Sequence, residues 1–299
     1  MKLIKSPVIG LFLGLSLLGA CSRNQNLVGK TFFETNQFAN SSHLKQSHII
    51  GGEEVLIDDP IAHSTVALYM PNEAPAEGIA NFCTGTLVAR NIVVTAAHCF
   101  KDVSELYLKI PLEEFVTRVR VGFGLNLVKN EHDTQVTFLK LKQVIIHPEY
   151  KAGMIRRAKN IPLPDVAILL LDGDAPESAI PAVMSADPEL IQAGREITLA
   201  GFGVISSGSR KMPKQLMKVN VTIDNPRLTS AQFSYNASSG KSACFADSGG
   251  PAYFEINKGE YVLGGITSWG DGYCSKIGVY TSVPAFNQFI NESIVRLLK

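Results

Sequence analysis

Residues 244–251 read CFADSGGP, and this stretch decides how the rest of the chain is interpreted. It places Ser248 among small residues, which let a backbone or a substrate approach the hydroxyl closely. A serine hydroxyl is a poor nucleophile until a neighbouring base takes its proton. A Ser-Gly-Gly sequence alone is also common in turns. The longer Asp-Ser-Gly-Gly-Pro after a cysteine is more specific, so a base and an orienting acid are expected elsewhere in the chain.

A candidate base and a candidate acid both precede Ser248. His98 lies in residues 95–99, TAAHC, directly after the strand-like run Ile92–Val94. Asp165 leads into the apolar run 166–171, VAILLL, which predicts a buried carboxylate that needs a partner. Taken singly, the histidine could be structural and the aspartate could cap a strand. The order His98, Asp165, Ser248 is nevertheless that of the chymotrypsin group, not of subtilisins or α/β-hydrolases.

From Ile49 to Lys299 the sequence resembles the chymotrypsin/trypsin-like serine proteases. The resemblance implies a secreted serine endopeptidase that acts on protein or peptide substrates through an acyl-enzyme on Ser248. His98 would be the base and then the acid, and Asp165 would orient it and stabilise its protonated form. The same resemblance implies no cofactor and no metal.

The resemblance also implies an all-β fold. It consists of two six-stranded antiparallel β-barrels with the three candidate residues in the cleft between them, followed by a C-terminal α-helix. Short runs with apolar or alternating character agree with strands, at Ser64–Tyr69, Gly85–Val88, Ile92–Thr95, Thr117–Val121, Gln135–Leu141, Val166–Leu171, Glu196–Ala200, Lys218–Ile223 and Tyr261–Ile266. Apolar residues recur at helical spacing near the end, at Phe286, Phe289, Ile290, Ile294 and Leu297. The stretch between His98 and Asp165 is longer than in compact members of the family, and the extra length, including Ala152–Pro164, is expected to form a surface loop.

The first twenty residues predict a signal peptide. Lys2 and Lys5 precede a short apolar run, Val8–Leu18, which is too short for an ordinary membrane-spanning helix. The run ends in Leu-Gly-Ala-Cys, which resembles a bacterial lipobox and predicts that Cys21 carries a lipid. The alternative is an ordinary signal peptide without a lipid. Residues 21–48, which are polar after the cysteine, are expected to be a propeptide or tether before a protease domain at 49–299.

Five cysteines in an exported protein leave one without a partner. In the family, bridges join Cys83 to Cys99 and Cys244 to Cys274, so the resemblance implies both pairs here. Cys21 is left over, where the lipid would be attached; a free thiol or an intermolecular bridge are the alternatives. We therefore expect a membrane-anchored lipoprotein precursor in the periplasm or outer membrane, and a mature enzyme that is released.

Ile49-Ile50-Gly51-Gly52 resembles the N-terminus that is freed when zymogens of this family are cut. The freed amine of Ile49 would form a buried ion pair with Asp247. Before cleavage, the oxyanion hole and the specificity pocket are expected to be disordered. A simple turn is the alternative interpretation. His48 precedes the cleavage point, so the activating protease is not expected to be trypsin-like.

The oxyanion hole contains the main departure from the family. Its donors map to the backbone N–H groups of Ser248 and Ala246, and the second position is a glycine in the family. If that position needs a conformation that only glycine adopts readily, the peptide could flip and remove one donor. The sequence therefore favours an active protease, slow or selective, over a catalytically weak or inactive homologue that acts as a binding protein. An esterase with little peptidase activity is a further alternative.

The resemblance places the specificity pocket at six residues: Ser242, Ala243, Ser268, Trp269, Gly270 and Gly278. With no carboxylate at Ser242 and glycines at two wall positions, we expect an open pocket for an apolar or aromatic P1 side chain. The edge at Ser268–Gly270 is expected to pair with the substrate backbone.

Composition excludes other function classes. The chain of 299 residues is 45% hydrophobic with a net charge of +1, so it has material for a core and no field that would attract nucleic acid. We expect a monomer. Acidic residues near Asn130, Glu131 and Asp133 more simply form a solvated loop than a calcium site.

Overall fold

The structure is a computed structural model of the chain, and it describes residues 49–71, 81–127, 136–156, 161–204 and 215–299. The chain divides into two units, residues 1–40 and 41–299, and every described residue belongs to the second. The predicted signal peptide, the lipid at Cys21, the tether and the acidic loop near Asn130 lie outside the described residues. Within the described ranges, no helix has both the length and the apolar character that crossing a membrane requires.

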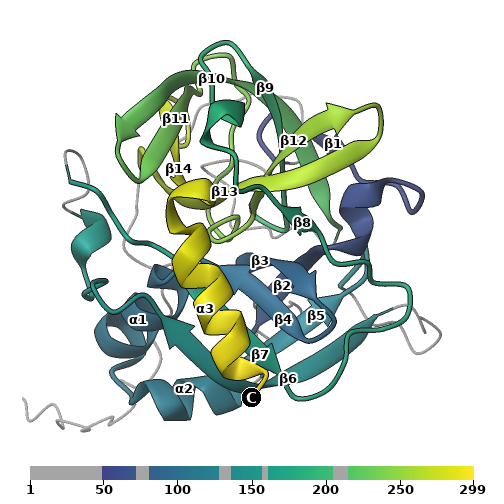
Figure 1. Cartoon of the computed structure of the whole chain (residues 1–299), viewed down its shortest axis with the longest axis vertical. Helices are drawn as coiled ribbons and strands as arrows, with labels where there is room; N and C mark the ends of the chain where they lie inside the picture. Colours follow the sequence, from purple (N-terminus) through teal and green to yellow (C-terminus); the bar gives the residue numbers. More distant parts are fainter. Residues whose placement is uncertain (1–48, 72–80, 128–135, 157–160, 205–214) are drawn as a thin grey trace, which may run out of the picture. The chain divides into compact units, whose positions relative to one another are not determined.

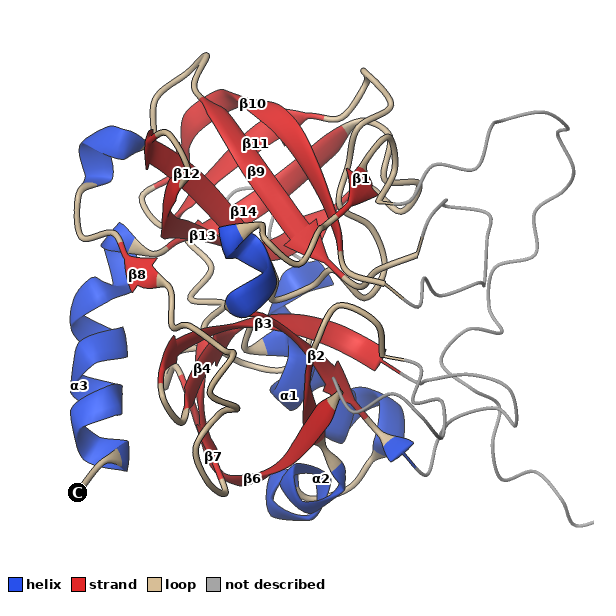
Figure 2. Ribbon diagram, turned by 90° about the vertical axis from the view of Figure 1, so that its right-hand side faces the viewer, coloured by secondary structure: helices blue, strands red, loops and turns tan. Residues whose placement is uncertain are grey.

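The N-terminal half of the described chain forms a closed antiparallel barrel (Figure 2). Its strands are β2 (Thr65–Tyr69), β3 (Asn81–Ala89), β4 (Ile92–Thr95), β5 (Arg120–Phe123), β6 (Thr137–Ile146) and β7 (Ala167–Leu171), in the order β2-β3-β4-β7-β6-β5. Every residue of β4 and β7 is buried, which explains their unbroken apolar sequences. The register pairs Thr95 with Ala167. Consequently, the end of β4, which leads to His98, lies beside the start of β7, which follows Asp165.

The C-terminal half forms a second barrel. Its strands are β9 (Glu196–Gly201), β10 (Met217–Thr229), β11 (Gln232–Asn236), β12 (Pro251–Asn257), β13 (Glu260–Gly270) and β14 (Ile277–Ser282), and pairing between β9 and β10 closes the ring. In β10, buried Met217, Val219 and Val221 alternate with polar residues, as a strand with one face in the core requires. The prediction of two six-stranded antiparallel barrels is confirmed. Two short strands add to this sheet: β1 (Glu53–Glu54) pairs with β10, and β8 (Val183–Met184) runs parallel to β13.

Helices cover the N-terminal barrel (Figure 1). The helical segments are α1 (His98–Asp102), a π-helical segment at Val103–Leu108, α2 (Leu112–Arg118) and α3 (Asn287–Leu297), with short 3₁₀ turns at Pro60–His63, Pro188–Leu190 and Pro284–Phe286. The predicted C-terminal helix is α3, which buries Ile290 and Leu297 in the core of the N-terminal barrel although it follows the C-terminal one.

One predicted strand is wrong at its start. The sequence predicts an extended run at Thr117–Val121, but its first residues complete α2, and β5 begins at Arg120. Pro111 stands before the first turn of α2 with Glu113 and Glu114 inside it, and Phe115 is buried. Acidic residues in a first turn favour a helix, and a single buried aromatic residue anchors one this short.

Candidate active site

The candidate acid and base are joined across the ends of β4 and β7. His98 opens α1, and its Nδ1 lies 2.8 Å from Oδ2 of Asp165. The backbone N–H of His98 donates to Oδ1 of the same carboxylate at 2.9 Å. The hydroxyl of Ser268, from β13 of the other barrel, donates to Oδ2 at 2.6 Å. Asp165 is fully buried, so these three donors supply the partners that a carboxylate without water needs.

The electrostatics of this pair strengthen the base. Burial by itself would lower the pKa of His98, but the charge of Asp165 and its hydrogen bond outweigh burial. The pKa of His98 is therefore raised above its usual 6.5. Asp102, at the other end of α1, adds a smaller contribution of the same sign.

Ser248 lies next to this pair, held by the N-terminal barrel. The backbone N–H of Thr84 donates to the Ser248 carbonyl at 2.8 Å. Cys83 and Cys99 form a disulfide, and Sγ of Cys99 lies 3.6 Å from that carbonyl and 3.8 Å from Nε2 of His98. The disulfide thus lies next to both the candidate base and the segment that carries the candidate nucleophile. No hydrogen bond joins the Ser248 hydroxyl to His98, both of which are described; such bonds often form only when substrate binds.

Ala246, the second predicted oxyanion donor, has a backbone conformation that glycine adopts more readily than alanine. Its φ is +70°, in the left-handed region that favours glycine. The preceding carbonyl, of Phe245, accepts a hydrogen bond from the backbone N–H of Val204 at 2.8 Å. In a trans peptide the N–H points opposite to the carbonyl, so the Ala246 N–H points away from Val204. Within the described chain neither this N–H nor that of Ser248 donates a hydrogen bond.

Comparison with known proteins agrees with this geometry. The family model described as trypsin matches residues 49–290. Trypsin of Saccharopolyspora erythraea is 30% identical over 259 residues, which cover 82% of this chain and 98% of that protein. Trypsin delta of Drosophila melanogaster is 31% identical over 223 residues (70% and 77%), and human kallikrein-4 is 27% identical over 264 residues (83% and 88%). The chain belongs to the trypsin family. It is accordingly a serine endopeptidase, and its disulfides fit an exported protein.

Tyr235, which the sequence did not indicate, lies against Ser242 and Gly278, two of the predicted pocket positions. Tyr235 is fully buried, and its hydroxyl lies 3.0 Å from Oγ of Ser242. The same oxygen accepts the backbone N–H of Ala243 at 2.9 Å. Tyr235 pairs with Gly278 across β11 and β14, and its ring occupies the space that a Cβ at Gly278 would need. The space beside Gly278 is therefore occupied by the Tyr235 ring.

The remaining pocket positions lie where β13 and β14 end. Gly270 pairs with Gly278, and Ser268 is buried beside Asp165 while Trp269 is half-buried. Cys244 forms a disulfide with Cys274 and thus ties the loop that carries Ser248 to the segment after β13. The six proposed pocket residues are brought together by this pairing and by the Tyr235 contacts.

Asp247 is buried between two backbone donors. Its two oxygens accept the backbone N–H groups of Gly203 and Cys244, each at 2.8 Å, and the residue is 1% exposed. Burial raises the pKa of Asp247 to about 7. Among the described residues no cationic side chain lies within ion-pair distance of it.

The Ile49–Ile50 segment lies against the loop that carries Asp247. The Ile49 side chain is fully buried in the core of the C-terminal barrel, and the Ile50 carbonyl accepts the backbone N–H of Ser242 at 3.0 Å. The expectation that the hole and pocket segments are disordered before cleavage stays a prediction.

Sequence reasoning missed Thr84, Tyr235 and Asp102. Asp102 is buried one helical turn from His98, and accepts hydrogen bonds from the Tyr150 hydroxyl and the Gly153 N–H, each at 3.1 Å. Its position four residues after His98 could have indicated this, because residues four apart are neighbours on one face of a helix. The other two stand in strand-like sequence, which gives no sign of a functional contact.

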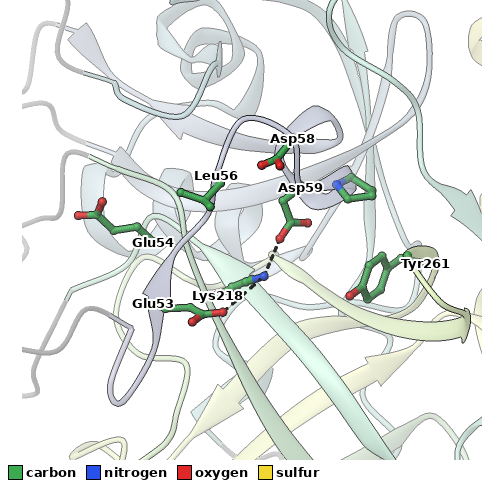
Figure 3. A pocket seen from close by; sticks show the side chains of 9 residues that line it. Glu53, Glu54, Leu56, Asp58, Asp59, Lys218 and Tyr261 are labelled. Carbon is green, nitrogen blue, oxygen red and sulfur yellow. Dashed lines mark hydrogen bonds and ion pairs between the residues drawn. The ribbon is translucent and has the colours of Figure 1, made fainter.

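A surface pocket of about 480 Å³ lies elsewhere (Figure 3). Lys218 crosses it and forms ion pairs with Asp59 at 2.6 Å and Glu53 at 3.5 Å. None of the candidate catalytic or specificity residues lines it, so we assign it no part in catalysis.

Proposed function

We propose that this protease cleaves peptide bonds through a covalent acyl-enzyme on Ser248. His98 accepts the hydroxyl proton as Ser248 attacks the carbonyl, and then gives it to the leaving amine. Asp165, which accepts the Ser268 hydroxyl, would hold His98 in the tautomer that leaves Nε2 free to accept. The N–H groups of Ser248 and Ala246 would receive the developing negative charge. The observation that carries the proposal is the bonded His98–Asp165 pair beside the Ser248 segment.

An apolar or aromatic P1 side chain follows from the hydrogen bonds at the pocket base. The Ser242 hydroxyl donates to the Ala243 carbonyl at 2.8 Å, so the proton between Ser242 and Tyr235 comes from Tyr235. Both hydroxyl protons are thereby committed, and no carboxylate is present to receive Lys or Arg. Transfer of such a cation into a neutral pocket is costly. The Ser268–Gly270 edge would bind the substrate backbone as an added strand.

Activation by cleavage before Ile49 is supported by the surroundings of Asp247. A new α-amine at Ile49 would supply the cation that this buried carboxyl lacks. Because His48 precedes the bond, we infer an activating protease that does not need a basic residue there. A lipid on Cys21 would hold the precursor to a membrane until this cleavage releases the domain. Mature enzyme that stayed in the membrane fraction after complete cleavage would contradict the release.

The decisive experiment uses the chain from Ile49 with a free N-terminus. A fluorophosphonate probe should label it, label the surface variant Ser239→Ala equally, and fail to label Ser248→Ala. Peptide substrates with Phe, Leu or Ala at P1 should be cleaved at least about tenfold better than those with Lys or Arg. Folded protein that takes no label would favour the inactive binding homologue, and preferred cleavage after Lys would contradict the pocket assignment.

A further inference from the structure

We propose that Thr84 is the positioning residue that holds the oxyanion hole in its working shape despite the alanine at position 246. The proposal rests on the acyl-enzyme function above. Thr84 belongs to β3 of the N-terminal barrel, whereas Ala246 belongs to the loop before β12 in the other barrel. The contact between Thr84 and Ala246 therefore joins the two barrels at the proposed oxyanion hole.

The Thr84 side chain is fully buried and bonded on both sides. Its hydroxyl donates to the Ala246 carbonyl at 2.9 Å. The same oxygen accepts the backbone N–H of Phe202 at 3.3 Å, which fixes the hydroxyl rotamer. Its own carbonyl accepts the Thr95 hydroxyl at 2.8 Å. Thr84 thus has no freedom to turn away from Ala246.

These contacts determine where the Ala246 N–H points. The Phe245 carbonyl is held by Val204 on one side of Ala246, and the Ala246 carbonyl is held by Thr84 on the other. With both flanking peptides fixed, φ at Ala246 has to stay near +70°, a value that an L-residue adopts at a cost. Glycine would adopt this conformation without such a hold. The backbone of Thr84 also anchors the second donor peptide, since its N–H binds the Ser248 carbonyl.

The test is a double-mutant cycle with Thr84→Val and Ala246→Gly, measured as kcat and KM on one peptide substrate. Valine keeps the shape of threonine and removes only the hydroxyl. We expect Thr84→Val to lower kcat about 10- to 100-fold with KM nearly unchanged, which is less than the roughly 10²–10³ lost with a whole donor. Thr84→Ser should stay within about threefold of the wild type because it keeps the hydroxyl. In the Ala246→Gly background, Thr84→Val should lower kcat by less than about fivefold, because glycine keeps the required φ without the hydrogen bonds from Thr84, which we call the clamp.

Thr86→Val is the matched control, a buried threonine two residues along the same strand. It should leave kcat unchanged. Equal losses from Thr84→Val with and without Ala246→Gly would overturn the clamp, as would wild-type kcat in Thr84→Val. Labelling by a fluorophosphonate of Ala246→Gly but not of the wild type would overturn the clamp while leaving Ser248 as the nucleophile. Labelling of neither would overturn the acyl-enzyme proposal and the clamp together.

Discussion

Asp247 should make the uncut chain lose stability as the pH rises. Its carboxyl is buried, receives only two backbone N–H groups among the described residues, and has its pKa raised to about 7 from the usual 3.8. The folded chain therefore keeps this proton over a pH range in which the unfolded chain has lost it. The perturbation that isolates the effect is Asp247→Asn, which removes the titration and nearly keeps the shape.

The expected magnitude follows from the two pKa values. A folded-state pKa above the unfolded value gives stability at low pH that is lost as the pH rises from about 4 to 7. The full loss is about 4 kcal/mol, because each pH unit between the two pKa values is worth about 1.4 kcal/mol. Between about pH 5 and pH 7 the share is about 2 kcal/mol. After cleavage before Ile49, the new amine would pair with the ionised carboxylate, and this loss should disappear.

The assay is urea unfolding of a chain that starts at Ser22, with Ser248→Ala added so that it cannot cut itself. The free energy of unfolding is compared at pH 5 and pH 7 with and without Asp247→Asn. Only the change with pH is used, since the asparagine amide adds a pH-independent clash with one of the two N–H groups. Asp172→Asn, at an exposed position, is the control that should keep the wild-type change. Equal changes with and without Asp247→Asn would refute the reasoning.

Two further predictions concern the base and the pocket. The acid limb of kcat/KM should have its midpoint above pH 6.5, because His98 must be neutral to act as a base. Asp165→Asn should move this midpoint to lower pH and lower kcat by about 10⁴, and Asp102→Asn should give a smaller shift of the midpoint. A pH–rate profile in which Asp165→Asn leaves the midpoint unmoved would contradict the assignment of His98 as the base. Tyr235→Leu should raise the ratio of kcat/KM for Phe over Ala at P1 by at least about tenfold, because it frees the space beside Gly278. The control Tyr253→Leu, at a buried tyrosine that contacts Ser64, should leave this ratio unchanged. Equal ratios in the wild type and both variants would show that Tyr235 does not limit the pocket.

Three of the strands that sequence reasoning found have a regular environment. β4 and β7 are wholly buried and wholly apolar, and β10 alternates regularly. β11 was missed because both of its faces are buried while it carries Gln232 and Ser234, which interrupt any apolar pattern. β14 was missed for the same reason, since Thr281 is fully buried within it. Polar residues buried inside a barrel interrupt the apolar pattern and leave no periodic signal in one sequence.

The same limit applies to the candidate site, where some residues could be located from the sequence and others could not. Residues that sit in short, specific motifs could be located from the sequence, as His98 and Ser248 were. Contacts that depend on strand register could not. The Tyr235 ring lies over Gly278 only because β11 and β14 pair in that register, and Ser268 reaches Asp165 across 103 residues of chain. Such contacts decide pocket depth and base orientation, and they come from the fold.

The candidate site is divided between the two barrels, and this division determines which parts of the site the ionisation of Asp247 can affect. The His98–Asp165 pair lies within the N-terminal barrel, and only the Ser268 hydroxyl reaches it from the other side. Asp247 contacts Gly203 and Cys244, both in the C-terminal half, beside the peptides that form the hole. We therefore expect a change in the charge state of Asp247 to act on the proposed oxyanion hole and pocket, while the base pair keeps its own hydrogen bonds. Thr84 is the residue through which the N-terminal barrel opposes that change, because it holds both the Ala246 and the Ser248 carbonyls. Under the proposed activation, two opposing contributions would set the readiness of the uncut chain for catalysis: ionisation of Asp247 above about pH 7, which would loosen the hole, and the Thr84 contacts, which would hold it.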